Sequence, residues 1–305
     1  MEKFNVNKSD NLDKPSSKFE SKEEKKIIKN FDTQYKQVIS EILEEGFLRP
    51  TRTGIPAYSL IGKTLEHDME NGFPLSSLRK MPEKSMRVET EFYLKGYTDK
   101  QWLIDRGCHF WDHWSSKKYH NKNDLGPTYG FEWRNFGTEY KGIGDYEGQG
   151  KDQIKWILEE LKKDPDSKRL IVSQWNPKDI DQQAIPPCPF AFQLIKYGEK
   201  LNLIFYQRSG DICLGVPNDF AQHALLLHLF CLETGYKPGK VTGIFGQVEL
   251  YENHLEGAKE LIKRESEKSP IIVTNNFKSI LDWSYTDTEF KDYKYGEKIY
   301  FPVAI

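Results

Sequence analysis

The stretch "FAFQLIKYGEKLNLIFYQRSG", residues 190–210, contains two runs of strand-forming residues separated by the turn-like segment "YGEK", residues 197–200. Branched and aromatic side chains favour strands, and glycine between charged residues favours a turn. We therefore predict a pair of adjacent strands at 190–198 and 201–210. A third strand-like run, "KRLIVSQW" at 168–175, shortly precedes them. Three strands so close together predict a sheet at the centre of the fold.

Helical patterns surround this group of strands. Apolar residues recur at helical spacing in six segments, 26–48 (ending near Gly46), 85–96, 97–107, 152–167 (ending before Pro165), 219–235 and 253–265, and further strands are predicted at 57–69 and 269–275. Residues 1–25 are rich in Lys, Ser, Asp and Asn, which predicts a disordered arm. We therefore expect one α+β (mixed α/β) domain over 26–305, with a central sheet flanked by helices.

The composition excludes several classes of partner. The 305 residues include 44 basic and 46 acidic side chains, a formal net charge of −2, and 37% are hydrophobic. This balance gives no general attraction to nucleic acid or to an anionic membrane, so we expect neither as a partner. No apolar run reaches the roughly 18 residues of a membrane span. The four cysteines show no CxxC pairing, and we expect a cytoplasmic protein.

Cys188 is the first candidate for chemistry. It follows two prolines in "AIPPCPF", residues 184–190, and their fixed backbone angles would mount a nucleophilic thiolate rigidly. The alternative is a buried, unreactive cysteine.

Arginines in turn-like or strand-end settings supply candidate anion ligands. A guanidinium group offers a fork of donors that suits a phosphate, and Arg52, Arg169 and Arg208 are placed for this. Each could instead be a surface residue or a structural ion pair. If they converged on the cysteine together with Lys168 and Ser209, they would form a phosphate cradle, and its positive field would lower the pKa of the thiol.

Other polar and aromatic residues leave more than one interpretation open. Glu89 would by default lie on a solvated helix face, and Trp111 and Trp114 would by default be core residues. The seven histidines show no metal-ligand spacing, so we expect no metal site. Neither GxGxxG nor GxxxxGK[ST] occurs, which argues against a dinucleotide-binding fold and a P-loop phosphotransferase.

Taken together, these segments resemble the thymidylate synthase family from about residue 30 to the C-terminus. The resemblance is carried by "TRTG", "GFPL", "DLGPTYGFEWR", "DPDSKRLIVSQWNP", "PPC", "YQRSGD", "YENH" and the final "PVAI", in the family's order and at about its spacing. It implies an obligate homodimer with a central twisted sheet. It also implies alkylation of carbon 5 of a pyrimidine nucleotide with methylenetetrahydrofolate as co-substrate.

The resemblance also implies roles for individual residues. Cys188 matches the nucleophile, and Glu89 matches the residue that organises water and proton transfer. Groups expected to hold the phosphate are Arg52, Arg208 and Ser209, with Lys168 and Arg169 donated across the dimer interface. Groups expected at the base and sugar are Gln207, Asp219, Glu249 and Tyr251. Groups expected at the folate are Arg79 (or the neighbouring Lys80), Trp111, Trp114, Asp211 and Ile305.

Three departures from the thymidylate-forming pattern bear on the substrate. Pro189 stands where these members have His, and Asp219 in "GVPNDFA" stands where they have Asn. Glu249 in "GQVELY" replaces the histidine that touches the sugar, whereas Tyr251 is kept. The segment "NDFA" resembles the "NDYA" of phage deoxycytidylate hydroxymethylases.

The aspartate suggests that the substrate is a cytosine nucleotide. An amide matches uracil because it both donates and accepts, whereas a carboxylate can only accept. Cytosine offers an amino donor and, once protonated, a ring N–H. A helix N-cap is another role for Asp219, although Asn would cap equally well. We therefore expect conversion of dCMP or CMP to its 5-hydroxymethyl derivative.

Several alternatives stay open from sequence. Thymidylate synthesis from dUMP and C5 methylation of a cytidylate are the alternatives within the family. A cysteine hydrolase would need a histidine near Cys188, and a nucleotide-binding protein without activity would have no use for Cys188 and Glu89.

Overall fold

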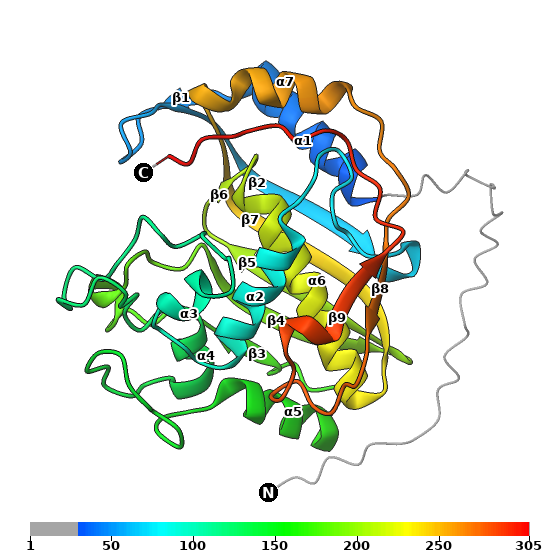
Figure 1. Cartoon of the computed structure of the whole chain (residues 1–305). Coiled ribbons are helices and arrows are strands. Elements are labelled where there is room, and N and C mark those ends of the chain that lie inside the picture. Colours follow the sequence, from blue (N-terminus) through cyan, green and yellow to red (C-terminus); the bar gives the residue numbers. More distant parts are fainter. Residues whose placement is uncertain (1–29, 305) are drawn as a thin grey trace, which may run out of the picture.

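A mixed β-sheet forms the centre of the described part of the chain, residues 30–304 of this computed structural model (Figure 1). The N-terminal arm expected over residues 1–25 and the expected folate contact Ile305 lie outside the described residues. Within residues 30–304 the sheet has seven strands in the order β1-β2-β7-β5-β4-β3, with β6 beside β7. Their bounds are β1 Phe47–Arg49, β2 Ala57–Asp68, β3 Ile171–Ser173, β4 Pro189–Tyr197, β5 Lys200–Gln207, β6 Gly210–Asp211 and β7 Lys237–Tyr251.

The pair of strands predicted at 190–210 is confirmed. β4 and β5 are antiparallel, with Phe192 opposite Phe205, and the turn includes Gly198 at a φ of 58°, a conformation that favours glycine. β5 and β6 run parallel to β7, and the other neighbouring strands are antiparallel. The sheet is therefore mixed, as the expected α+β (mixed α/β) fold requires.

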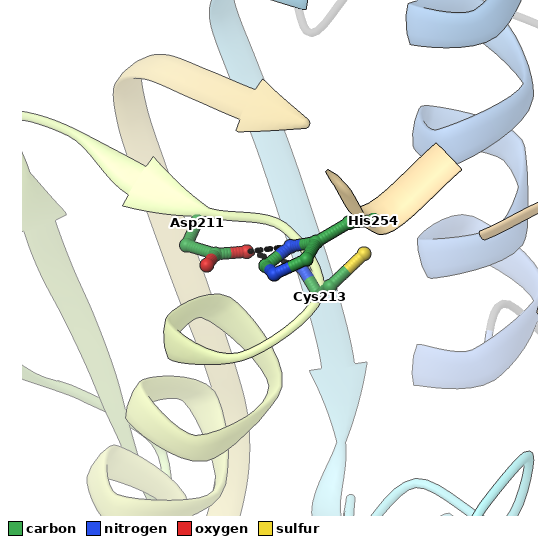
Figure 2. A group of neighbouring side chains, drawn as sticks. All are labelled: Asp211, Cys213 and His254. Carbon is green, nitrogen blue, oxygen red and sulfur yellow. Dashed lines mark hydrogen bonds and ion pairs between the residues drawn. The ribbon is translucent and has the colours of Figure 1, made fainter. Parts of the chain in front are cut away.

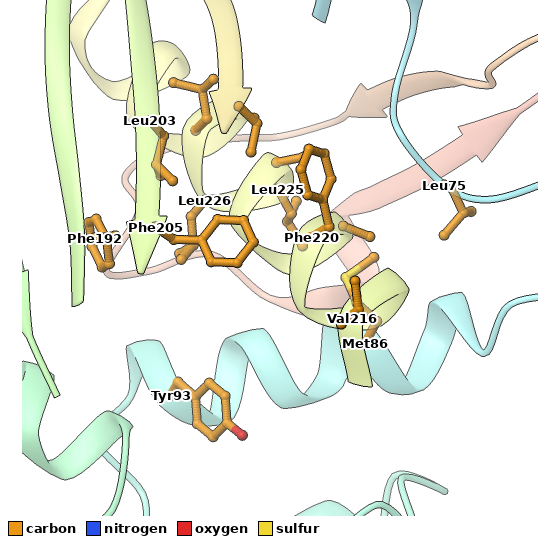
Figure 3. Close-up of a cluster of buried hydrophobic side chains, with 14 of the residues drawn as sticks. Leu75, Met86, Tyr93, Phe192, Leu203, Phe205, Val216, Phe220, Leu225 and Leu226 are labelled. Atoms are coloured by element: carbon orange, nitrogen blue, oxygen red, sulfur yellow. The ribbon is translucent and has the colours of Figure 1, made fainter. Parts of the chain in front are cut away.

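The long helix α6, Gly215–Thr234, packs across one face of this sheet. Figure 3 shows Phe205 of the sheet beside Phe220 and Leu226 of the helix, and all three are fully or almost fully buried. The helix begins four residues earlier than predicted, and its N-cap is Leu214. Asp219 is therefore the fifth helical residue, so the alternative of an N-cap role is wrong.

Most of the other predicted helices are present. They are α1 Phe31–Glu45, α2 Glu83–Leu94, α5 Gln153–Lys163 and α7 Leu255–Lys263. Of the helix predicted over 97–107, only the short helix α3, Gln101–Ile104, is present. The segment before it pairs instead with residues near 124, because the Lys100 amide donates to Asn123 and the Leu125 amide donates to Thr98. Among the described residues no helix is long and apolar enough to cross a membrane.

Several short elements, including β1, were not predicted. The helix α4, Gly130–Asn135, follows Tyr129, and β9, Thr288–Lys291, pairs with β8, Ile271–Thr274, in a separate two-stranded sheet. Elements this short lack enough residues to show a periodic pattern. α4 positions Tyr129 beside the candidate site described below.

The sheet face that points away from α6 carries apolar side chains. Ile171 and Ile244 are 44% and 37% exposed, and Ile204 and Tyr206 are half-buried on the same face. Apolar residues on the central strands of a sheet are normally covered by another layer. Within the described residues these side chains remain open to solvent.

Candidate active site

A cavity of about 800 Å³ opens where β4, β5, β6 and β7 meet the N-terminal end of α6. It brings together ten residues that were singled out in the sequence, namely Arg52, Trp114, Cys188, Gln207, Arg208, Ser209, Asp211, Asp219, Glu249 and Tyr251. Val303 and Ala304, next to the expected contact Ile305, also line it. Residues more than 150 positions apart in the sequence thus converge on one cysteine, as a cradle requires.

Arg208 holds the loop that carries Cys188. Its guanidinium group donates to the carbonyl oxygens of Pro187 and Pro186, at 2.9 and 2.8 Å, and lies 3.7 Å from the Cys188 sulfur. The hydroxyl of Tyr129 accepts a hydrogen bond from the Cys188 amide at 2.9 Å. The thiol is therefore fixed at the cavity wall from two sides, which is the stiff mount that the prolines suggested.

The arginines that reach the cavity lower the pKa of the Cys188 thiol, as expected, but in the single chain burial acts more strongly. Burial raises the pKa of Cys188 to about 11, and the nearby carboxyl groups of Asp219 and Glu249 add to the increase. Arg208 and Arg52 lower the pKa but do not outweigh burial. In the single chain Cys188 is therefore mostly a thiol at neutral pH, and its proton must leave during attack.

Asp219 faces the same cavity from α6. The amide nitrogen of Gln207 donates to its Oδ2 at 2.8 Å and to the carbonyl oxygen of Ser209 at 3.0 Å. Two acceptors on one side fix the orientation of the Gln207 amide. Within the described residues Oδ1 of Asp219 has no hydrogen-bond partner, so this oxygen is available to a ligand.

Burial gives Asp219 an unusual protonation state. Burial, followed by the charge of Glu89, raises the pKa of Asp219 to about 8, and the hydrogen bond from Gln207 opposes the shift. The carboxyl group is therefore mostly protonated at neutral pH. Since Gln207 donates to Oδ2, the proton belongs on Oδ1, the oxygen without a partner.

Glu89 lies behind the cavity wall rather than on a solvated helix face. Its side chain on α2 accepts from the indole N–H of Trp111 and from the amide of Gln222, both at 2.6 Å. Burial raises the pKa of Glu89 against the effect of these hydrogen bonds. A buried carboxyl with a raised pKa is suited to moving protons. Gln222 was missed in the sequence, although its i, i+3 relation to Asp219 places it on the same helix face.

Lys100 holds the loop that carries the two tryptophans. Its ammonium group donates to the carbonyl oxygens of Trp111, Asp112 and Trp114, at 3.4, 3.0 and 2.7 Å. Trp111 is buried, as expected by default, whereas Trp114 lines the cavity. The sequence did not single out Lys100, because nothing in its spacing shows that a lysine is buried.

The end of the cavity near Arg208 contains a network of hydrogen bonds centred on Glu249. Its carboxylate accepts from the hydroxyl of Ser209 at 3.2 Å and from the amide of Gln247. Arg49 in turn donates to Gln247. The hydroxyl of Ser209, expected to hold phosphate, is thus bound to Glu249 here. Arg49 and Gln247 were missed, since a lone arginine or glutamine gives no sequence signal.

Asp211 lies on β6 next to Glu249, its register partner on β7, and also lines the cavity. One carboxylate oxygen accepts from the backbone amides of Cys213 and Leu214, at 2.8 and 3.2 Å, which leaves the other oxygen free of these bonds. Arg79, expected to bind the folate tail, instead donates to the carbonyl oxygen of Cys213 at 2.6 Å and is buried. It does not line the cavity, whereas its neighbour Lys80 is exposed.

Lys168 and Arg169 lie apart from the other predicted phosphate ligands. Both are exposed in the turn between α5 and β3, and neither lines the cavity. In a single chain they therefore contribute nothing to the site. Their expected contribution from a partner subunit stays a prediction.

Comparison with known proteins finds relatives that match most of the chain. A family model described as thymidylate synthase matches residues 33–305. A thymidylate synthase of Mycoplasma genitalium is 35% identical over 297 residues, which cover 89% of this chain and 99% of that protein. A bifunctional dihydrofolate reductase-thymidylate synthase of Paramecium tetraurelia is 35% identical over 283 residues. That alignment covers 90% of this chain, which spans 61% of the length of the Paramecium protein.

Proposed function

The chain belongs to the thymidylate synthase family of one-carbon transferases, and from this membership we propose that it converts a cytidylate to 5-hydroxymethyl-cytidylate. The carbon would come from methylenetetrahydrofolate, the co-substrate of the family. One observation carries the choice of base: the carboxyl group of Asp219 faces the cavity of Cys188 and keeps Oδ1 free for a ligand. The sugar, ribose or deoxyribose, is left open.

The protonated carboxyl of Asp219 matches the edge of cytosine. Its Oδ1–H would donate to the ring nitrogen N3 of cytosine, and its carbonyl oxygen would accept from the amino group. When Cys188 adds to carbon 6 of the base, electron density moves into the ring and N3 becomes more basic. The proton would then pass from Asp219 to N3, and a carboxylate beside a protonated ring would stabilise the adduct.

The protonated carboxyl also fits uracil, which gives a second candidate function. A neutral acid donates and accepts, so it could pair with the carbonyl O4 and the N3–H of uracil as an amide does. Thymidylate synthesis is therefore the alternative, and the names of the two relatives agree with it. Cytosine remains favoured because its N3 can take the proton in the adduct, whereas uracil's O4 is a much weaker base.

The folate side of the cavity has the chemistry that a flat heterocycle requires. Trp114, Leu214 and Val303 provide an apolar wall, and the free carboxylate oxygen of Asp211 can accept from ring N–H groups. Methylenetetrahydrofolate would supply the carbon at the oxidation level of formaldehyde.

Residues of this chain would carry the remaining steps. The thiolate of Cys188 forms a bond to carbon 6, and carbon 5 then acts as the nucleophile toward the one-carbon unit. Loss of the carbon 5 proton and departure of tetrahydrofolate would leave an exocyclic methylene, water would add to it, and release of Cys188 would restore the ring. Glu89, with Trp111 and Gln222 fixing its two oxygens, would position that water and move its proton.

Incubation of the protein with methylenetetrahydrofolate and one nucleotide at a time (CMP, dCMP or dUMP), followed by mass spectrometry, tests the proposal. We expect a hydroxymethylated cytidylate, and no product from Cys188→Ala. The matched control Cys231→Ala replaces a buried cysteine of α6 that does not line the cavity, so it should retain activity. Thymidylate as the dominant product would establish the second candidate instead. A methylated cytidylate would support cytosine as the base but would contradict the addition of water to the transferred carbon.

A homodimer would complete the phosphate site. The open apolar face around Ile171 and Ile244 suits a second copy, and Arg169 lies two residues from Ile171 at the edge of this face. We therefore expect Lys168 and Arg169 to reach the cavity of the partner.

Mixing two inactive variants tests this arrangement. Cys188→Ala and Arg169→Ala should each lose activity alone. If subunits exchange, half of the dimers are mixed and one site in each is intact, so about a quarter of the activity should return. No recovery despite proven exchange would mean that each chain builds its own site.

A further inference from the structure

His254 connects the folate side of the cavity to the C-terminal segment. It lies fully buried where β7 leads into α7, and Figure 2 shows its ring directed toward Asp211. Its Nε2 lies 2.7 Å from the carbonyl oxygen of Pro302, and its Nδ1 lies 3.6 Å from Oδ1 of Asp211. One imidazole thus contacts both the residue expected to hold the pterin and the segment that closes the cavity.

The two contacts of His254 determine where its protons lie. A carbonyl oxygen can only accept, so Nε2 must carry a hydrogen toward Pro302. In a neutral ring Nδ1 would then present a lone pair to the carboxylate of Asp211, and two acceptors would face each other. Within the described residues Nδ1 has no other hydrogen-bond partner. A second proton on Nδ1 removes this conflict and gives an ion pair.

The charges around His254 favour that second proton. Burial alone would lower the pKa of His254, but the Asp211 carboxylate and the Pro302 carbonyl oxygen together raise it above the ordinary value. The Arg79 guanidinium opposes them. The ring is otherwise packed by Phe301, at 5.2 Å between centroids, and by Tyr251, at 5.7 Å.

A metal ion is a poorer explanation of this cluster than a proton. Ligand atoms of Asp211, Cys213 and His254 lie within 4.8 Å of one another (Figure 2). However, burial raises the pKa of Cys213 well above its ordinary value, so the thiol is protonated. The nearby guanidinium of Arg79 also repels a cation, and Nε2 of His254 is already used by Pro302.

The contacts of the C-terminal segment, residues 301–304, show what this proton would control. Phe301 is buried between the His254 ring and the Arg79 guanidinium, which lies 5.3 Å from its centroid. Val303 and Ala304, two residues further on, line the cavity. The position of this wall therefore depends on the contacts that His254 makes.

We propose that His254 is a positioning residue, whose doubly protonated ring fixes Asp211 and the C-terminal segment together on the folate side of the cavity. Loss of the Nδ1 proton would leave one hydrogen for two acceptors, so the ring could serve Asp211 or Pro302 but not both. Docking of the segment should therefore weaken as the pH rises through the titration of His254. The effect on folate rests on the proposed function, whereas the protonation state does not.

NMR of the protein labelled with ¹⁵N in its histidine rings tests the protonation state without any substrate. The resonances of His254 are identified by their loss in His254→Gln. We expect both nitrogens to be protonated at pH 6 and the titration to lie above the ordinary histidine range. In Asp211→Asn the titration of His254 should move to lower pH, because the carboxylate no longer offsets the effect of burial, which lowers the pKa. A neutral ring at pH 6, or a titration unmoved in Asp211→Asn, would overturn the proposal.

Kinetics then test the link to folate. Between pH 6 and 9 the KM for methylenetetrahydrofolate should rise about tenfold, the size expected for one charge-assisted hydrogen bond. The KM for the nucleotide follows the titration of Asp219, so its pH profile should be the same in the wild type and in His254→Gln. His254→Gln should have a high folate KM that no longer depends on pH. The control His228→Gln, which replaces a partly buried histidine bound to Thr274, should retain the wild-type profile. An unchanged pH profile in His254→Gln would refute the positioning role, even if the proposed reaction were confirmed.

A second variant separates the position of the segment from the charge of the ring. A Cβ added at Gly257 would lie 2.5 Å from the Phe301 ring, so Gly257→Ala should displace the segment. We expect it to raise the folate KM at every pH while the His254 ring still titrates. Wild-type folate KM in a variant whose segment is shown to be displaced, for example by faster proteolysis after residue 300, would contradict the proposal.

Discussion

Replacement of Asp219 by asparagine should move the base preference from cytidylate toward uridylate. The amide of Gln207 donates to Oδ2 of Asp219 at 2.8 Å and cannot turn, because the Ser209 carbonyl also needs its N–H. In Asp219→Asn the new amide oxygen must therefore face Gln207, and its NH₂ takes the place of Oδ1. This NH₂ can still donate to N3 of cytosine, but it cannot transfer a proton to the ring of the adduct.

The size of the shift follows from the interaction that the variant loses. With cytosine, the hydrogen bond between the Asp219 carboxylate and the protonated ring of the adduct is lost, and a hydrogen bond to a charged group contributes about 1.5 to 3 kcal/mol. With uracil, no proton passes to N3, so the same substitution should change the rate little. The ratio of kcat/KM for the two nucleotides should thus change by about 10-fold to 160-fold.

The assay is competition of both nucleotides in one reaction, with the products separated by mass. Asp105→Asn makes the same chemical change at the exposed C-cap residue of α3, outside the cavity, and its ratio should equal that of the wild type. An unchanged ratio in Asp219→Asn, with both variants folded, would mean that the base is read by another residue.

Further predictions concern residues around the cavity. Lys100→Met leaves three carbonyl oxygens of the tryptophan loop without their donor. We therefore expect the free energy of unfolding in urea to fall by about 2 to 4 kcal/mol and the folate KM to rise. The control Lys118→Met, at an exposed lysine, should change neither. Glu89→Gln keeps the size of the side chain but cannot move a proton. We therefore expect kcat to fall about 100-fold to 10,000-fold, with little change in nucleotide binding. A kcat near that of the wild type would show that Glu89 has no role in the mechanism. The pKa of Asp219 is raised from an ordinary value of 3.8 to about 8. The contribution of this carboxyl group to the free energy of unfolding is therefore full below about pH 4 and is lost as the pH rises toward 8. The stability of the wild type relative to Asp219→Asn, measured by denaturant unfolding, should therefore decrease over that window, and a difference that does not vary with pH would show that the carboxyl is not perturbed.

The sequence predicted the elements whose patterns are long and periodic. The pair of strands at 190–210 and the helix α5 were found because apolar residues repeat over eight or more positions and turn residues mark their ends. The prediction of a helix over 97–107 was wrong for most of this range, because backbone pairing with residues near 124 competes with the local helical preference. Such pairing joins distant segments and leaves no local pattern.

The sequence predicted which residues gather at the cavity, but not their electrostatics. Motif matches placed Cys188, Arg208 and Asp219 correctly on one cavity. The pKa of Cys188 could not be foreseen, because burial opposes the arginines and burial depends on the whole fold. The same limit applied to Asp219, whose raised pKa turns the expected carboxylate into an acid that can supply a proton.

Covalent trapping can show which base Cys188 attacks. Fluorine at carbon 5 of the base cannot leave as a proton does, so a 5-fluoro nucleotide should stay bonded to the sulfur once methylenetetrahydrofolate has reacted. With equal amounts of 5-fluoro-cytidylate and 5-fluoro-uridylate, we expect mass spectrometry of the peptide containing Cys188 to show mainly the cytosine adduct. A peptide that carries mainly the uracil adduct would contradict the role of Asp219 as the residue that selects cytosine.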